Sequence, residues 1–305
     1  MFKKLKPYFQ LVRLPNVFTA AADSLAGWLW VGGAWGVWRV WLPLAVASMA
    51  IYAAGIALND VFDLAIDREE RPNRPIPSGR VSVRFAAVLG TVLLAIGLLA
   101  AGLTGKTSVA IVAGAIVAAV LAYDLGVKRT ILGPEVMGIC RMLNVLMGMA
   151  AGSSVATDRP SGAIVAGSIG VFVVGLTWVS RSETHSGRRS GLAAGVSIQA
   201  LSLAFLATSA IGTVRPYLAP ASSVWNVALG LSVLAAVAFF VGRAAWNAWR
   251  EPIPPRIQAL VKTSVLSLVW LDVAIVASRR GPLDALAVAA LWVPAFVLGR
   301  WIYST

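Results

Sequence analysis

The chain has 305 residues, of which 58% are hydrophobic and only 13% are charged. So few polar residues could not cover the surface of a soluble globular domain, which excludes that class of protein. The net charge of +13 would suggest nucleic-acid binding in a soluble chain, but in a membrane protein it marks loops that face anionic lipid. We therefore expect a lipid bilayer as partner and no nucleic acid.

Ten apolar segments, each about 20 residues long, follow one another along the chain. Runs of this length are sufficient to cross a bilayer as helices, which satisfy their own backbone hydrogen bonds in lipid. The sequence therefore predicts an all-α, polytopic membrane helical bundle, with residues 1–305 in a single domain. The segments span about 16–35, 40–60, 83–103, 107–124, 135–156, 162–180, 192–212, 223–248, 257–277 and 283–302.

Basic residues are distributed unequally between the two sides of the predicted membrane. If the N-terminus is cytoplasmic, nineteen Lys and Arg residues lie at cytoplasmic ends and six lie at the opposite ends. Short loops rich in Lys and Arg stay in the cytoplasm. The distribution therefore predicts that the polar segment 60–82 faces the cytoplasm, and a connection of that length is often functional.

Three aspartates, Asp60, Asp63 and Asp67, close the second apolar segment at spacings i, i+3 and i+7. On one helix they would share a face, with Asn59 one turn from Asp63. Carboxylates gathered at the end of an apolar run favour a divalent cation, and Mg²⁺ takes oxygen ligands that phosphate oxygens complete. We expect a metal and phosphate site here. The alternative is a solvated acidic face paired with nearby arginines, namely Arg68, Arg71 and Arg74.

Polar residues at the ends of two other segments fall on the same predicted side. Arg13 and Asn16 open the first segment, and Tyr123 and Lys128 follow the fourth. A basic residue in such a place is ordinarily an interfacial anchor, although a diphosphate beside the aspartates would also attract it.

The fifth segment contains Arg141, with Asn144 three residues later on the same helix face. A buried arginine in a membrane is costly and faces a partner or a cavity. Two interpretations are open. One is an ion pair with Asp23 or Asp272, which also lie within apolar segments; the other is neutralisation of diphosphate by the planar guanidinium.

A weak internal repeat relates the two halves of the chain. A shift of 120 residues places Glu183 on Asp63 but puts Ser180 and Gly187 on the other two aspartates. Repeats in membrane folds place substrates between the halves. Glu183 is thus a candidate further ligand, and His185 in the same polar loop is either simply exposed or accepts a proton from an acceptor substrate.

The stretch 59–79 resembles the first aspartate-rich motif of the UbiA superfamily of intramembrane prenyltransferases. That motif is N-D-x-x-D-x-x-x-D, which is present at 59–67, with a trailing R-P-x-x-R-P-I-P-S-G, whose counterpart at 71–79 reads R-P-N-R-P-I-P-S-G and is one residue shorter. Further stretches at 13–16, 132–144 and 180–185 resemble the UbiA-like EboC branch, so that the likeness spans nearly the whole chain.

The resemblance implies a bundle of nine to ten transmembrane helices in a bacterial inner membrane, with the active site facing the cytoplasm. It implies a Mg²⁺-dependent enzyme that moves an isoprenyl group from a prenyl diphosphate to a hydrophobic acceptor, such as an aromatic one, and releases diphosphate. Asp60, Asp63 and Asp67 would bind Mg²⁺ and, with Glu183 and His185, carry catalysis. The residues expected to bind substrate are Arg13, Asn16, Asn59, Arg68, Arg74, Tyr123, Lys128, Arg141, Asn144 and Arg181.

The family carries a second aspartate motif after the sixth span, and here only Glu183 stands for it. We therefore expect one firmly held metal, because Glu183 with water and substrate oxygens is a weak ligand set for Mg²⁺. Three other functions stay open: a terpene cyclase acting on a prenyl diphosphate, transfer to or from a polyprenyl phosphate, and a non-catalytic isoprenoid-binding protein.

Overall fold

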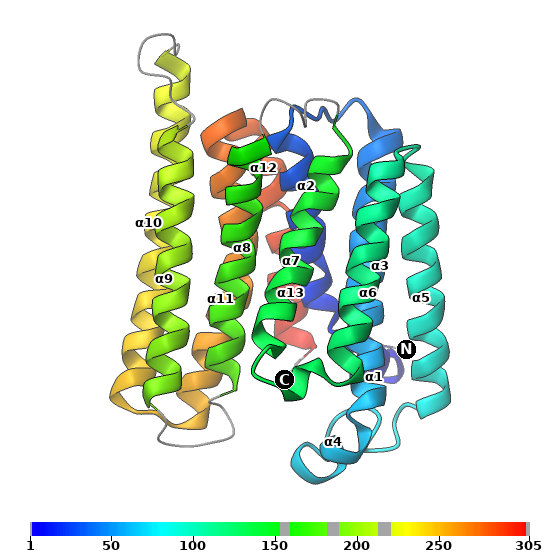
Figure 1. The fold of residues 1–305 in the computed structure, drawn as a ribbon. Helices are drawn as coiled ribbons and strands as arrows, with labels where there is room; N and C mark the ends of the chain where they lie inside the picture. The colour runs from blue at the N-terminus through cyan, green and yellow to red at the C-terminus, as the bar shows by residue number, and fades with distance from the viewer. Residues whose placement is uncertain (1, 153–158, 182–188, 213–220, 303–305) are drawn as a thin grey trace.

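The structure is a computed structural model that describes residues 2–152, 159–181, 189–212 and 221–302. Within these ranges the regular structure is helical and contains no strand, which confirms the predicted all-α class. The long helices run roughly side by side (Figure 1). They are α1 (Phe2–Leu11), α2 (Leu14–Trp30), α3 (Trp38–Phe62), α4 (Leu64–Glu70), α5 (Val83–Leu103), α6 (Thr107–Leu125), α7 (Gly133–Ala150), α8 (Arg159–Ser180), α9 (Arg189–Gly212), α10 (Ala221–Arg250), α11 (Pro254–Arg280), α12 (Pro282–Ala289) and α13 (Trp292–Trp301).

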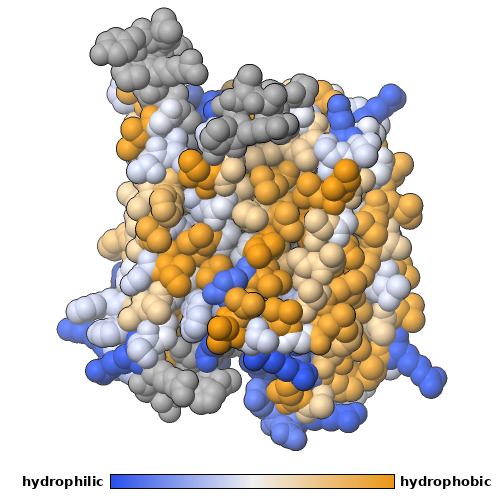
Figure 2. Space-filling view, viewed as in Figure 1, coloured by the Kyte–Doolittle hydropathy of each residue, from blue (hydrophilic) through white to orange (hydrophobic). Residues whose placement is uncertain are grey.

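Each of the ten predicted segments overlaps a helix, and the last one divides into α12 and α13. Eight of the described helical stretches are long and apolar enough to cross a membrane. The other two segments correspond to α2, which has 17 residues, and α7, which has 18. Apolar side chains cover much of the middle of the molecule, with hydrophilic ones gathered toward its two ends (Figure 2). The protein is a multi-pass membrane protein.

Helix α2 lies in the interior of the bundle, against α3, α7, α11 and α13. Fourteen of its 17 residues are buried. Its contact with α7 depends on glycine, because a Cβ atom at Gly148 would lie 1.9 Å from the carbonyl oxygen of Ser24. A Cβ at Gly27 would lie 2.1 Å from the carbonyl oxygen of Val145. Small residues let the backbones of membrane helices approach closely, which fixes α2 against α7.

The end of α3 and the chain that follows it form one side of a polar end of the bundle. Hydrogen bonds from Asp63 N to Asn59 O (2.9 Å) and from Asp67 N to Asp63 O (2.8 Å) carry the helical pattern from α3 into α4. The segment after α4 then folds back, and its Ile76 and Val81 are buried against α1, α3 and α5. Figure 1 places α4 and the turn between α6 and α7 at the same end.

Candidate functional site

The first and third aspartates of the motif share one cation. Asp60 and Asp67 are buried, with 4% and 1% of their surface exposed. Arg74 reaches both from the segment after α4: its Nη1 donates to Asp67 Oδ2 at 2.7 Å and to Asp60 Oδ1 at 3.2 Å. Arg74 is itself buried, and hydrogen bonds to charged partners are the strong ones in such surroundings.

The second aspartate has a different partner. Asp63 lies between α3 and α4, and its Oδ1 is 2.8 Å from the Nζ atom of Lys128. Lys128 Nζ also lies 3.5 Å from Asp124 Oδ1, near the end of α6. Asn59 donates to that same oxygen of Asp124 at 2.7 Å. This network ties the end of α3 to the end of α6.

The expectation that all three aspartates converge on one cation is therefore only partly met. Asp60 and Asp67 share Arg74, whereas Asp63 turns toward Lys128. In the part of the chain that the structure describes, no three acidic, His or Cys side chains come together as a metal-binding group. The oxygens of Asp60 and Asp67 are nevertheless the hard ligands that Mg²⁺ prefers, so the chemistry of the site fits that ion.

Two more of the predicted residues lie within electrostatic range of these carboxylates. Arg13 attracts Asp60 electrostatically, and Tyr123 interacts electrostatically with Asp124, Asp63 and Arg13. Arg13 is the one described non-glycine residue with positive φ (φ 44°, ψ 53°), between α1 and α2. This left-handed conformation costs an ordinary residue about 1–2 kcal/mol, and it occurs where the chain turns from α1 into α2, beside the site.

The remaining residues at this end have separate roles. Arg181, at the end of α8, donates to the carbonyl oxygens of Lys128 (2.9 Å) and Thr130 (2.8 Å), so it holds the turn that carries Lys128. Asn16 is half-buried near the start of α2, and its carbonyl accepts from Thr19 at 2.7 Å. Arg68 is exposed on α4. Glu183 and His185 lie outside the described residues.

Arg141 and Asn144 lie apart from this cluster, in the interior of the bundle. Arg141 forms an ion pair with Asp23 and donates to Thr19 Oγ1 at 2.7 Å. Its guanidinium lies 4.9 Å from the ring centre of Tyr52. Asn144 Nδ2 donates to Asp23 Oδ2 at 3.0 Å. Of the two interpretations left open by the sequence, the geometry favours the ion pair.

Asp272 of α11 faces the same ion pair and is fully buried. No described N–H or hydroxyl group donates to its carboxyl oxygens, and its hydrogen-bonding neighbour is the carboxyl group of Asp23. The interior therefore holds two carboxylates, Asp23 and Asp272, around a single guanidinium.

Asp124 is a site residue that the sequence interpretation left out of the predicted set. It lies four residues before Lys128 and is buried at the end of an apolar helix. An acidic residue at that depth, one helical turn from a lysine, was the available signal.

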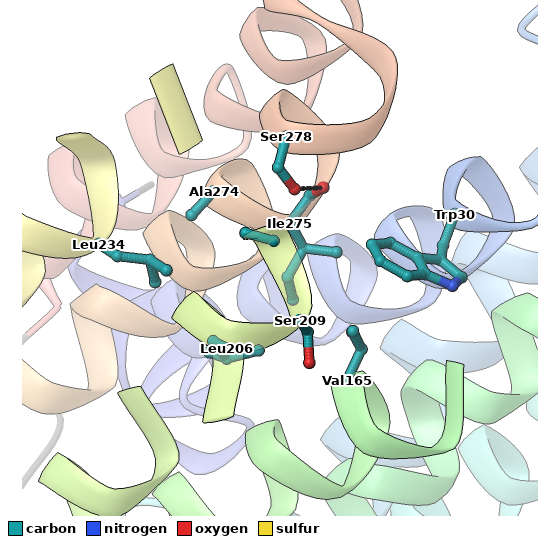
Figure 3. Close-up of a pocket in the computed structure, with 9 residues that line it drawn as sticks. Trp30, Val165, Leu206, Ser209, Leu234, Ala274, Ile275 and Ser278 are labelled. Carbon is teal, nitrogen blue, oxygen red and sulfur yellow. Dashed lines mark hydrogen bonds between the residues drawn. The ribbon is translucent and has the colours of Figure 1, made fainter. Parts of the chain in front are cut away.

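A small cavity lies between α2, α8, α9, α10 and α11, near the opposite end of α2 from Arg13 (Figure 3). The hydroxyls of its two serines donate to their own helices, Ser278 to Ile275 O and Ser209 to Phe205 O, both at 2.8 Å. Its walls are otherwise apolar, with the residues Trp30, Val165, Leu206, Leu234, Ala274 and Ile275 among them. The residues that line the cavity include no titratable side chain.

Known proteins are similar in sequence to part of this chain. The digeranylgeranylglyceryl phosphate synthase of Sulfurisphaera tokodaii is 40% identical over 95 residues, which cover 31% of this chain and 34% of that one. The protein of the same name from Metallosphaera sedula is 36% identical over 146 residues, or 47% and 51% of the two chains. The matches thus span about a third to a half of the relatives' length.

Solved structures share the fold over most of the chain. A UbiA homolog from Aeropyrum pernix K1 in its apo form has a TM-score of 0.66 at 19% identity, covering 85% of this chain and 96% of that one. A UbiA homolog from Archaeoglobus fulgidus, bound to GPP and Mg²⁺, has a TM-score of 0.53 at 15% identity, covering 88% and 99%. The model of the UbiA prenyltransferase family matches residues 20–266. The chain therefore belongs to the UbiA prenyltransferase family, whose enzyme class is the one that the motif at 59–79 predicted.

Proposed function

We propose that this protein is a Mg²⁺-dependent intramembrane prenyltransferase that moves an isoprenyl group from a prenyl diphosphate to an acceptor and releases diphosphate. The observation that carries the proposal is the cluster of buried carboxylates and cations where α3, α4 and α6 end. Arg74 contacts Asp60 and Asp67 there, and Lys128 contacts Asp63 and Asp124, at one end of a bundle of mostly apolar helices. The site can thus hold a charged head group while the bundle accommodates a hydrocarbon tail.

The metal would be held by Asp60 and Asp67, with Asp63 as the third carboxylate of the motif. When bound, Mg²⁺ supplies positive charge that stabilises the departing diphosphate. Lys128 and Arg74 are placed to donate to phosphate oxygens, and each already contacts an acidic side chain of the site. Of the other predicted ligands, Asn59, Arg13, Tyr123 and Arg181 each interact with a residue of the cluster, and Arg68 is exposed on α4.

The reaction breaks the bond between the first prenyl carbon and the diphosphate oxygen, and the bonding electrons leave with diphosphate. The acceptor nucleophile then bonds to that carbon and loses a proton. His185 is our candidate for receiving the proton and Glu183 for a further ligand; one firmly held metal is expected. Apolar side chains around the reacting carbon would exclude water, which would otherwise capture the allylic cation.

The acceptor is proposed in two forms. A hydrophobic acceptor, such as an aromatic one, is what the family resemblance implies. The relatives' name, digeranylgeranylglyceryl phosphate synthase, supports a lipid that contains a glyceryl phosphate instead. The basic residues at the site are compatible with this second form, because a phosphate on the acceptor would also need neutralisation.

We also propose a cellular location for the protein and a branch of the family to which it belongs. The nineteen-to-six division of basic residues supports a cytoplasmic position for the site. A bacterial inner membrane is proposed from the family resemblance alone. The stretches at 13–16 and 132–144 support the EboC branch. We further propose that residues 1–305 form one domain, since the site draws on α2, α3, α4 and α6 and the interior ion pair joins α2 to α7.

The direct test is release of diphosphate from prenyl diphosphates of several chain lengths by the purified protein with Mg²⁺. A transferase requires an acceptor for fast release, a cyclase does not, and a binding protein releases none. We expect Asp63→Ala to lose Mg²⁺-dependent diphosphate binding, because it removes the middle carboxylate and the partner of Lys128. Asp284→Asn is the matched control, since that aspartate pairs with Trp35 and Arg280 at the other end of α2. Normal binding by folded Asp63→Ala would refute the site.

A further inference from the structure

Arg74 occupies the one place that Asp60 and Asp67 share. A single guanidinium nitrogen, Nη1, lies 2.7 Å from Asp67 Oδ2 and 3.2 Å from Asp60 Oδ1. All three side chains are buried. A metal ion bridging the same two oxygens would need the position of that nitrogen. Arg74 and a bridging cation therefore exclude each other by geometry.

The backbone around Arg74 is anchored without help from its guanidinium. The carbonyl oxygen of Arg74 accepts from Ser78 Oγ at 2.6 Å and from Ser78 N at 3.0 Å. Ile76 and Val81 are buried in the cluster that includes Leu11. The side chain can therefore leave the two carboxylates while the loop stays folded over the site.

We propose that Arg74 is a built-in counter-ion, which neutralises Asp60 and Asp67 until Mg²⁺ and diphosphate arrive together. This inference rests on the proposed function. Mg²⁺ alone must displace the guanidinium and leave it in a buried place without an anion, which is unfavourable. Mg²⁺ with diphosphate supplies a cation for the aspartates and an anion for Arg74, so every charge keeps a partner.

The consequence is coupled binding of metal and diphosphate. The site holds Mg²⁺ weakly when diphosphate is absent, which prevents a tightly bound ion from blocking the aspartates between turnovers. Coupling between two ligands is reciprocal, so diphosphate must also bind weakly when Mg²⁺ is absent. Typical coupling changes affinity by about 5- to 150-fold.

The test uses Arg74→Gln, in which the amide keeps part of the side-chain volume and removes the charge. Binding of Mg²⁺ alone, and of inorganic diphosphate at fixed free Mg²⁺, is measured by calorimetry on the full chain in lipid nanodiscs. Arg74→Lys retains a cation. Arg71→Gln is the matched control, because Arg71 lies 3.9 Å from Asp67 Oδ1 but its side chain is 44% exposed.

We expect Arg74→Gln to bind Mg²⁺ alone on the order of tenfold more tightly than the wild type, and to bind diphosphate more weakly. Arg74→Lys and Arg71→Gln should stay within about twofold of the wild type, since each leaves a cation beside the aspartates. An affinity of Arg74→Gln for Mg²⁺ alone that equals the wild-type value would overturn the inference.

Folding is followed in the same samples by thermal unfolding. If Arg74→Gln is unstable without metal, Mg²⁺ should raise its Tm by more than it raises that of the wild type, because a ligand stabilises the state that it binds. An equal or smaller increase would contradict the counter-ion role. Asp67→Asn separates the two proposals. If Asp67→Asn binds Mg²⁺ as the wild type does when diphosphate is present, the metal site itself is wrong. If Asp67→Asn loses that binding while Arg74→Gln binds Mg²⁺ alone as the wild type does, only the inference fails.

Discussion

Replacing Arg141 with methionine should destabilise the protein without affecting the diphosphate site. The guanidinium pairs with Asp23, donates to Thr19 and lies over Tyr52. Thr19 keeps its own hydrogen bond to Asn16 O, so the dominant loss is the charge partner of Asp23. Removing one member of a buried ion pair costs about 3–5 kcal/mol, and we expect a loss of that size.

Asp272→Asn provides the comparison within the same cluster. It replaces a buried carboxyl group that lies beside Asp23 with a neutral amide that can donate to Asp23, while the Asp23–Arg141 pair stays intact. Its stability should therefore equal or exceed that of the wild type. The two variants change neighbouring residues, yet their effects should differ in sign or differ by several kcal/mol.

The assay is the free energy of unfolding in mixed detergent micelles, together with binding of Mg²⁺ and inorganic diphosphate to the folded fraction. Arg141→Met should keep wild-type affinity for diphosphate. If it is fully stable and has lost that affinity, then Arg141 is a ligand of diphosphate and the ion-pair interpretation is refuted. If Asp272→Asn loses as much stability as Arg141→Met, the charge-balance reasoning is wrong.

Three further outcomes are expected. Gly148→Ala should destabilise the bundle by about 1–3 kcal/mol, because its Cβ would lie 1.9 Å from a carbonyl oxygen of α2. Thermal or detergent unfolding measures this loss. Gly114→Ala is the control and should not destabilise the bundle, because Gly114 has open space around it. Arg181→Ala should raise the KM for the prenyl diphosphate while leaving Tm nearly unchanged, since it frees the turn that carries the site lysine. In a Cys140→Ser background, Asn73→Cys should react with thiol reagents only from the cytoplasmic side; labelling from the other side would reverse the topology.

The positions of the helices were largely predictable from the sequence. The segment predicted at 83–103 has the same limits as α5, and that at 107–124 ends one residue before α6 does. In both cases an apolar run is bounded by polar or glycine-containing turns, and Ser82 caps α5 by accepting a hydrogen bond from Phe85 N. Such signals are local in the chain, so they can be recognised without knowledge of the tertiary structure.

The partners of the charged residues were much less predictable. Spacing places the three aspartates on one face of an ideal helix, but Asp63 pairs with Lys128, which is 65 residues away in sequence. Nothing in the local pattern specifies that contact, because it depends on how α3 packs against α6. Arg141 is a similar case: its depth indicated a partner or a cavity, and only the packing of α2 against α7 decides in favour of Asp23.

The interior position of α2 has a consequence for how the protein is made. As α2 leaves the ribosome it is 17 residues long and contains Asp23, so a bilayer would hold it less firmly than the longer, more apolar α5. The arginine that neutralises Asp23 is synthesised 118 residues later. Stable integration of α2 into the membrane should therefore wait until α7 has been synthesised. Variants that weaken the contact between α2 and α7 should reduce the yield of protein in the membrane before they reduce catalysis.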